Sequence, residues 1–133
     1  MLIYCDSMIL IYYLDHFGPW QVRASSRLAA LRRAGDQLVI SDLSRLECRV
    51  GPIRRRDNLT LAKLDAFFAL ADVVQAPLTA VVFDRATEIR AAHGFRTADA
   101  IHLAAAIVQG CGAFLTNDAR LSKVTGMSVE QLP

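Results

Sequence analysis

Residues 97–116 have the sequence TADAIHLAAAIVQGCGAFLT, and this stretch decides the fold class. Its first part, residues 97–108, is alanine-rich and apolar on nearly all sides, which predicts a buried helix ending before Gly110. The apolar run at residues 114–116 follows closely and predicts a buried strand. A buried helix beside a buried strand indicates an α/β protein whose sheet is covered by helices.

The rest of the chain repeats this alternation on both sides of the stretch. Strands are predicted at residues 2–5, 38–40, 73–74, 114–116 and 128–130. Helices are predicted at residues 7–14, 21–34, 41–50, 60–71, 79–92 and 97–108, and Gly51-Pro52 is expected to stop the third of them. We therefore expect a single domain over residues 1–133, with a three-layer α/β/α fold and a mainly parallel central sheet of about four or five strands.

The composition is that of a globular protein, with 53% hydrophobic and 21% charged residues. A net charge of +2 is too small to indicate nucleic-acid binding by itself. Three cysteines without a CxxC pair favour a reducing compartment. Neither a signal peptide nor an apolar run of membrane-spanning length is evident. We expect a cytoplasmic protein that does not enter a membrane.

Two acidic residues follow predicted strands. Asp6 comes directly after the first strand, and Asp118 comes just after the strand that ends at Thr116. Ligand crevices in parallel sheets lie at the carboxyl ends of the strands, so both acids fall where a site would be built. The alternative is that each aspartate caps the helix that follows it.

Glu47 shares one predicted helix face with Leu43, Leu46 and Val50. An unpaired carboxylate inside an apolar stripe is costly, which favours a functional role. The alternative is a capping box formed with Ser44, which requires the helix to begin at that serine. A start at Ser41 or Asp42 accounts better for Leu43 on the same face.

Asp99 lies on one face of the alanine-rich helix together with His102. With Thr97 as the expected cap, Asp99 falls in the first turn, where the helix dipole favours the ionised carboxylate. A purely structural first-turn acid remains the alternative. His102 is interpreted as a hydrogen-bonded core histidine or a neighbour of Asp99, and not as a catalytic base.

Four carboxylates converging in one crevice repel one another unless cations neutralise them. Oxygen ligands of this kind suit Mg²⁺ or Mn²⁺, which can activate water and stabilise the leaving oxygen in phosphodiester hydrolysis. Four arginines crowd a short segment after Glu47 and are interpreted as a phosphate-binding loop, with a solvated loop as the alternative. They are Arg49, Arg54, Arg55 and Arg56.

Four segments resemble the PIN-domain nucleases, and in particular the VapC toxins of type II toxin–antitoxin pairs. They are YCDS (4–7), LSRLE (43–47), RTADAIHLA (96–104) and FLTND (114–118). Their order and spacing match over essentially the whole chain. The stretch from Thr97 to Ala104, followed by Thr116-Asn117-Asp118, is the most specific part.

The resemblance implies a Mg²⁺- or Mn²⁺-dependent endoribonuclease that cleaves structured RNA such as tRNA or rRNA. Asp6 and Asp99 would be the principal catalytic metal ligands, completed by Glu47 and Asp118. Thr116 would orient the site or a water molecule beside the metal, supported by Ser7. Many relatives carry Asn shortly after the first Asp, and Ser7-Met8 replaces that polar pair only in part.

The same resemblance implies a homodimer and a cognate VapB-like antitoxin. The antitoxin's C-terminal segment would enter the acidic groove, where an arginine could replace the charge of the metal.

Three other functions are consistent with parts of the sequence. A metal-independent ribonuclease would use two of His16, His93 and His102 as acid and base. A phospho-acceptor receiver domain would need adjacent acids where Asp6-Ser7 stands. A catalytically inactive PIN-like module that binds RNA or a partner would have little use for a buried acidic groove.

Overall fold

The computed structural model describes residues 1–15 and 18–133 of the chain, so His16, one of the histidines considered above, lies outside the described residues. The elements are β1 (Leu2–Cys5), α1 (Ser7–Leu14), α2 (Pro19–Arg33), β2 (Gln37–Ile40), α3 (Asp42–Arg54), α4 (Asn58–Phe68), β3 (Val74–Gln75), α5 (Ala80–His93), α6 (Thr97–Gln109), β4 (Ala113–Thr116), the 3₁₀ helix η1 (Ala119–Lys123) and β5 (Ser128–Gln131). The five strands form one parallel sheet in the order β3-β2-β1-β4-β5. The predicted α/β fold with a parallel sheet is confirmed.

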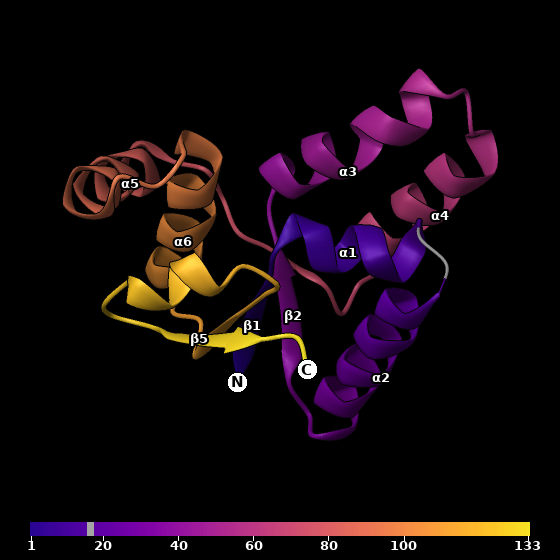
Figure 1. Cartoon of the computed structure of the whole chain (residues 1–133), viewed down its shortest axis with the longest axis horizontal. Helices are drawn as coiled ribbons and strands as arrows, with labels where there is room; N and C mark the ends of the chain where they lie inside the picture. Colours follow the sequence, from indigo (N-terminus) through magenta and orange to yellow (C-terminus); the bar gives the residue numbers. More distant parts are fainter. Residues whose placement is uncertain (16–17) are drawn as a thin grey trace.

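Helices cover both faces of the sheet (Figure 1), with α5 and α6 on one face and α1 to α4 on the other. Strand β1 lies in the centre and is therefore buried on both faces, which explains its continuous apolar character. Successive side chains of a strand point to opposite faces. Ile3 and Cys5 accordingly join the core on the α1 side, whereas Tyr4 joins the core on the α6 side.

Helix α3 differs from its prediction at the C-terminal end. It continues through Pro52 to Arg54, so the expected stop at Gly51-Pro52 is wrong. Proline lacks one backbone donor, but its fixed φ is helical, and the Pro52 ring is buried. At the other end the helix begins at Asp42 with Ser41 as its cap, which contradicts the alternative start at Ser44.

The alanine-rich helix α6 is buried as predicted and ends at Gly110, whose φ of 80° suits glycine. Its N-terminal cap is Arg96 and not Thr97. The helix therefore begins at Thr97, and Asp99 lies in the first turn as predicted. Helix α4 begins at Asn58 and not at the predicted residue 60. Asp57 caps it, and its side chain accepts a hydrogen bond from the Thr60 backbone N–H at 3.0 Å. Within the described ranges, no helix combines the length and apolarity that crossing a membrane requires.

Candidate active site

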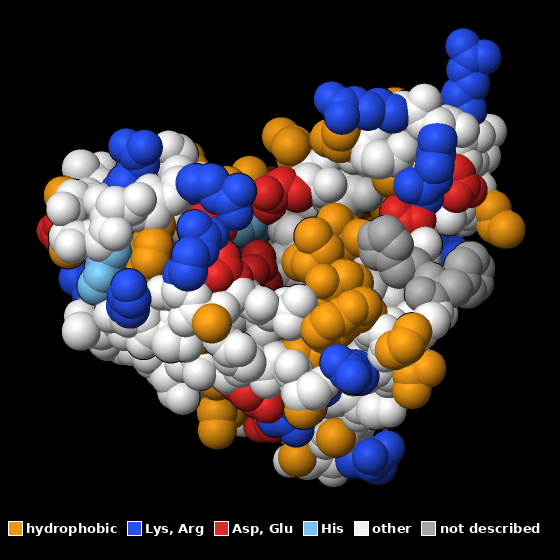
Figure 2. All heavy atoms as spheres, viewed as in Figure 1, with side chains coloured by type: hydrophobic (Ala, Val, Ile, Leu, Met, Phe, Trp, Pro, Cys, Tyr) orange, Lys and Arg blue, Asp and Glu red, His pale blue; other side chains and the backbone are white. Residues whose placement is uncertain are grey.

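The carboxyl ends of β1 and β4 lie side by side and form the floor of a cleft of about 650 Å³. The Asp6 backbone N–H donates to the carbonyl oxygen of Leu115 at 2.9 Å, which joins the two strand ends. All four predicted acids line this cleft, namely Asp6, Glu47, Asp99 and Asp118. Figure 2 shows acidic side chains in the hollow, with basic side chains beside them on one edge.

Asp6 is held from two directions. The Thr116 hydroxyl donates to its Oδ2 at 2.7 Å, and the Ser7 backbone N–H donates to its Oδ1 at 2.8 Å. Burial raises the pKa of Asp6, although the charge of His102 and these two hydrogen bonds act in the opposite direction. Asp6 is therefore a half-buried carboxylate whose ionised form would gain from a nearby cation.

Glu47 reaches the cleft from α3 and meets two donors at one oxygen. The Ser7 hydroxyl donates to Oε1 at 2.8 Å, and Nε2 of His102 lies 2.5 Å from the same atom. Burial acts to raise the pKa of Glu47, but the hydrogen bond and charge of His102, with Ser7, hold it below its usual value. His102 is thus a hydrogen-bonded buried histidine, and its carboxylate partner is Glu47 and not Asp99.

Asp99 and Asp118 are paired with exposed arginines. Nε of Arg96 lies 3.2 Å from Oδ2 of Asp99, and Nη2 of Arg120 lies 2.5 Å from Oδ2 of Asp118. The hydrogen bond from Arg120 keeps the pKa of Asp118 below its ordinary value. Sequence reasoning gave neither arginine a role, although Arg96 lies three residues before Asp99, a common spacing for local ion pairs.

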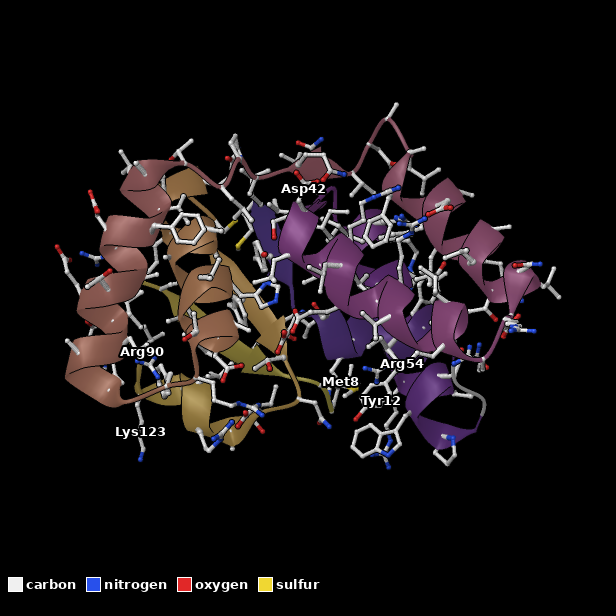
Figure 3. All side chains as sticks on the ribbon, turned by 90° about the horizontal axis from the view of Figure 1, so that it is seen from above. Met8, Tyr12, Asp42, Arg54, Arg90 and Lys123 are labelled. Atoms are coloured by element: carbon white, nitrogen blue, oxygen red, sulfur yellow. The ribbon has the colours of Figure 1, made fainter. Side chains whose placement is uncertain are left out.

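One wall of the cleft is apolar. It comprises Met8, Ile11 and Tyr12 from α1, with Leu46 and Val50 from α3. Leu46 and Val50 of the apolar stripe predicted around Glu47 therefore face the cleft and not the core, and Leu46 is 60% exposed. In Figure 3 the labelled Met8 and Tyr12 lie on α1 beside the loop after β4, where Asn117 donates to the Tyr12 hydroxyl at 3.0 Å.

The four arginines after Glu47 lie outside the cleft lining, on the C-terminal part of α3 and the turn that follows. Nε of Arg49 lies 3.0 Å from a carboxylate oxygen of Asp65. Arg55 pairs with both Asp15 and Asp57. Arg54 and Arg56 are exposed, and Figure 3 shows Arg54 at the end of α3 opposite Asp42.

The donor chemistry of the cleft fits a hard divalent cation. Carboxylate oxygens from four separate segments face one space, and desolvation raises the pKa of Asp6, so a cation nearby would favour its ionised form. Over residues 1–15 and 18–133, no three His, Cys, Asp or Glu side chains are close enough to form a ready-made metal site. Asp99 and Asp118 instead contact arginine nitrogens in this structure.

Comparisons with known proteins agree with the fold. A family model of the PIN domain matches residues 3–127. The fold is similar to that of VapBC2 from Rickettsia felis, solved with a promoter DNA fragment, at a TM-score of 0.82 and 16% identity over 100% of both chains. VapC20 from Mycobacterium tuberculosis, described as a sarcin-ricin loop cleaving toxin, is similar at a TM-score of 0.79 and 17% identity over 96% of this chain and 98% of that one. A DNA-bound VapBC from Salmonella typhimurium is similar at a TM-score of 0.78 and 16% identity over 100% of both chains. A comparison with curated proteins gives no match.

Proposed function

The chain belongs to the PIN domain family, and from this premise we propose that it is a toxin-type endoribonuclease that hydrolyses RNA phosphodiester bonds with a divalent cation. The single observation that carries the proposal is the gathering of four carboxylates around one cleft at the carboxyl ends of β1 and β4. A crevice at that edge of a parallel sheet is where such folds place their reactive groups.

Asp6 and Asp99 would hold Mg²⁺ or Mn²⁺, with Glu47 and Asp118 completing the ligand set. When bound, the ion supplies a Lewis acid that lowers the pKa of water and neutralises charge on the scissile phosphate. The chain's own residues hold the carboxylates in place. Thr116 and the Ser7 backbone fix Asp6, and the Ser7 hydroxyl with His102 fixes Glu47.

The arginines on the rim would serve the substrate. Arg96 and Arg120 are 76% and 57% exposed and flank the acidic floor. When a cation replaces them at Asp99 and Asp118, their guanidinium groups become available to RNA phosphates. The apolar wall on α1 and α3 would receive side chains of a VapB-like antitoxin, whose own basic residue would enter the acidic floor. A homodimer is proposed from family membership.

The first experiment is cleavage of total tRNA and rRNA by the purified protein with Mn²⁺ or Mg²⁺, with EDTA, and with Asp99→Asn. Discrete fragments that require both the cation and Asp99 are expected. Asp72→Asn is the matched control, because Asp72 is 64% exposed and lies outside the cleft lining. Both variants should melt near the temperature of the unchanged protein.

The chemistry of the fragment ends gives a second, independent test. Hydrolysis by water leaves a 5′-phosphate and a 3′-hydroxyl, whereas attack by the ribose 2′-hydroxyl leaves a 2′,3′-cyclic phosphate. The cyclic product, or cleavage that persists in EDTA, would contradict the proposed chemistry. Metal binding without cleavage of any RNA would favour the catalytically inactive binding module.

The arginine cluster remains a proposed RNA-binding surface. Arg54 and Arg56 are exposed, whereas Arg49 and Arg55 are held by nearby aspartates. Replacing Arg54 and Arg56 together by Gln should weaken RNA binding. The slope of log affinity against log salt concentration should become shallower by the amount expected for the loss of about one to two phosphate contacts. Unchanged affinity and salt slope would show that this surface does not bind the RNA backbone.

A further inference from the structure

A chain of buried side chains connects the centre of the sheet to Glu47. The Tyr4 hydroxyl lies 2.8 Å from Oγ of Ser41 and 2.7 Å from Nδ1 of His102, whose Nε2 lies 2.5 Å from Oε1 of Glu47. Tyr4 and Ser41 are fully buried, and His102 is 2% exposed. The four residues come from β1, the cap of α3, α6 and α3, so the fold itself fixes the chain.

The direction of these hydrogen bonds follows from the carboxylate. An ionised Glu47 has no proton to donate, so Nε2 of His102 must carry the hydrogen. When the ring is neutral, Nδ1 is an acceptor and the Tyr4 hydroxyl donates to it, and when the ring carries a charge, Nδ1 donates to the Tyr4 oxygen while Nε2 still donates to Glu47. With the ring neutral, the Tyr4 oxygen in turn accepts from the Ser41 hydroxyl. The tautomer of His102 is thereby set by residues that lie far from the cleft opening.

Both donors to Glu47 use the same oxygen. The Ser7 hydroxyl and His102 Nε2 both contact Oε1, and within the described part of the chain no hydrogen bond reaches Oε2. A glutamate on a helix ordinarily samples several rotamers, and holding it in one costs conformational entropy. Two donors from separate helices offset that cost and leave the second oxygen free for another ligand.

A histidine that only packs in the core would be satisfied by Tyr4 and by a carbonyl or hydroxyl nearby. Nε2 of His102 does lie 3.3 Å from Oγ of Ser7, but it lies closer, at 2.5 Å, to Oε1 of Glu47, a cleft carboxylate that is 33% exposed. We propose that His102 is a positioning residue that, with Tyr4 behind it, holds Glu47 so that Oε2 is presented to the divalent cation. This inference rests on the proposed metal-dependent function.

The test replaces His102 by Gln or by Asn, two amide side chains of different length. The amide nitrogen of Gln can occupy the place of Nε2 and donate to Glu47, whereas that of Asn lies near the place of Nδ1 and cannot reach it. Mn²⁺ binding would be measured by calorimetry on the folded protein without RNA. His102→Asn should bind Mn²⁺ about 10-fold more weakly, as is typical when a residue supporting a metal ligand is lost. His102→Gln should retain most of the affinity.

A double-mutant cycle identifies the carboxylate through which His102 acts. In a Glu47→Gln background, His102→Asn should change Mn²⁺ affinity by less than about 2-fold, because the group that it positions is already altered. Tyr4→Phe keeps the ring that stacks on Phe114 and removes only the hydroxyl. Its Mn²⁺ affinity should fall less than that of His102→Asn, and it provides the test if the Asn variant does not fold.

Three results would overturn the inference. Equal affinities for the Asn variant and the unchanged protein would show that Glu47 needs no such support. Equal losses in the Asn and Gln variants would assign the effect to packing of the ring. A full loss that persists in the Glu47→Gln background would place the effect at another ligand. If the unchanged protein binds no Mn²⁺, the proposed metal-dependent function fails together with the inference. The first three results overturn only the role of His102, so the two kinds of failure are distinguishable.

Discussion

The carboxylates of the cleft form two pairs that are held in different ways. The inner pair, Asp6 and Glu47, is held by buried donors that come from β4, α6 and the start of α1. The outer pair, Asp99 and Asp118, is held by Arg96 and Arg120, which are both exposed. One pair is held by donors of the core, and the other is held by side chains of the surface.

This difference separates what the fold fixes from what solution conditions can change. Buried hydrogen bonds are costly to leave unmade, so the inner carboxylates keep their positions whether or not a cation is present. Exposed ion pairs are weak and screened by salt, so the outer carboxylates can exchange arginine for another cation. The inner pair would define the position of the ion, and the outer pair would complete the site when the ion arrives.

The largest expected effect is on cleavage. Asp6→Asn should lower the cleavage rate by roughly 10³-fold or more, because it alters the fixed part of the ligand set. Asp118→Asn should lower it by only about 10-fold, since water can replace a ligand at the exposed rim. Single-turnover rates on one RNA at saturating Mn²⁺ would measure both. Equal losses would remove the distinction between the pairs.

A smaller effect is expected on stability. Thr116→Val removes the donor to Oδ2 of Asp6 at nearly constant volume, and should destabilise the fold by about 1–3 kcal/mol. Thr116→Ser keeps the hydroxyl and should be close to the unchanged protein. Arg120→Gln should leave the melting temperature unchanged. Urea unfolding of the three variants would sharpen the comparison, and a destabilised Arg120→Gln would contradict it.

The smallest expected effect is a gain in thermal stability. Burial raises the pKa of Asp6 in the folded protein above its value in the unfolded chain. Ionisation of this group therefore lowers the free energy of unfolding, and the loss grows as the pH rises from the ordinary carboxyl range to the folded pKa. In EDTA at neutral pH, Asp6→Asn should therefore melt at a higher temperature than the unchanged protein. The difference should disappear below about pH 3, where the carboxyl is protonated in both states. A lower melting temperature at neutral pH would contradict the cost assigned to burial.

The sequence predicted the elements that have strong periodicity and clear end signals. The strand at residues 2–5 and the helix at residues 7–14 match β1 and α1 to the residue. The alanine-rich helix was placed within one residue because Gly110 ends it. Pro52 misled the prediction for α3, because a proline with a helical φ in a buried position costs one hydrogen bond without ending the helix.

The four acids were predicted from strand ends and helix faces, but their partners were not. Tyr4 and His102 are 98 residues apart, and no local pattern connects residues at that separation. Leu46 and Val50 have the spacing of a core stripe, yet they face a cleft, because periodicity shows that residues share a face and not what lies opposite it. Arg120 lies in η1, a short 3₁₀ helix that the sequence pattern did not predict, so its contact with Asp118 was not predicted either.

The position of β1 in the sheet has a consequence for biosynthesis. Thr116, which fixes Asp6, is made 110 residues after it, and Asp118 is made later still. Strand β4 must pair with β1 before the inner and outer acids can share a cleft. A nascent chain that is still short of Asp118, or one released early by a premature stop, therefore lacks the assembled site. The order of synthesis would spare the translating cell from activity in incomplete molecules.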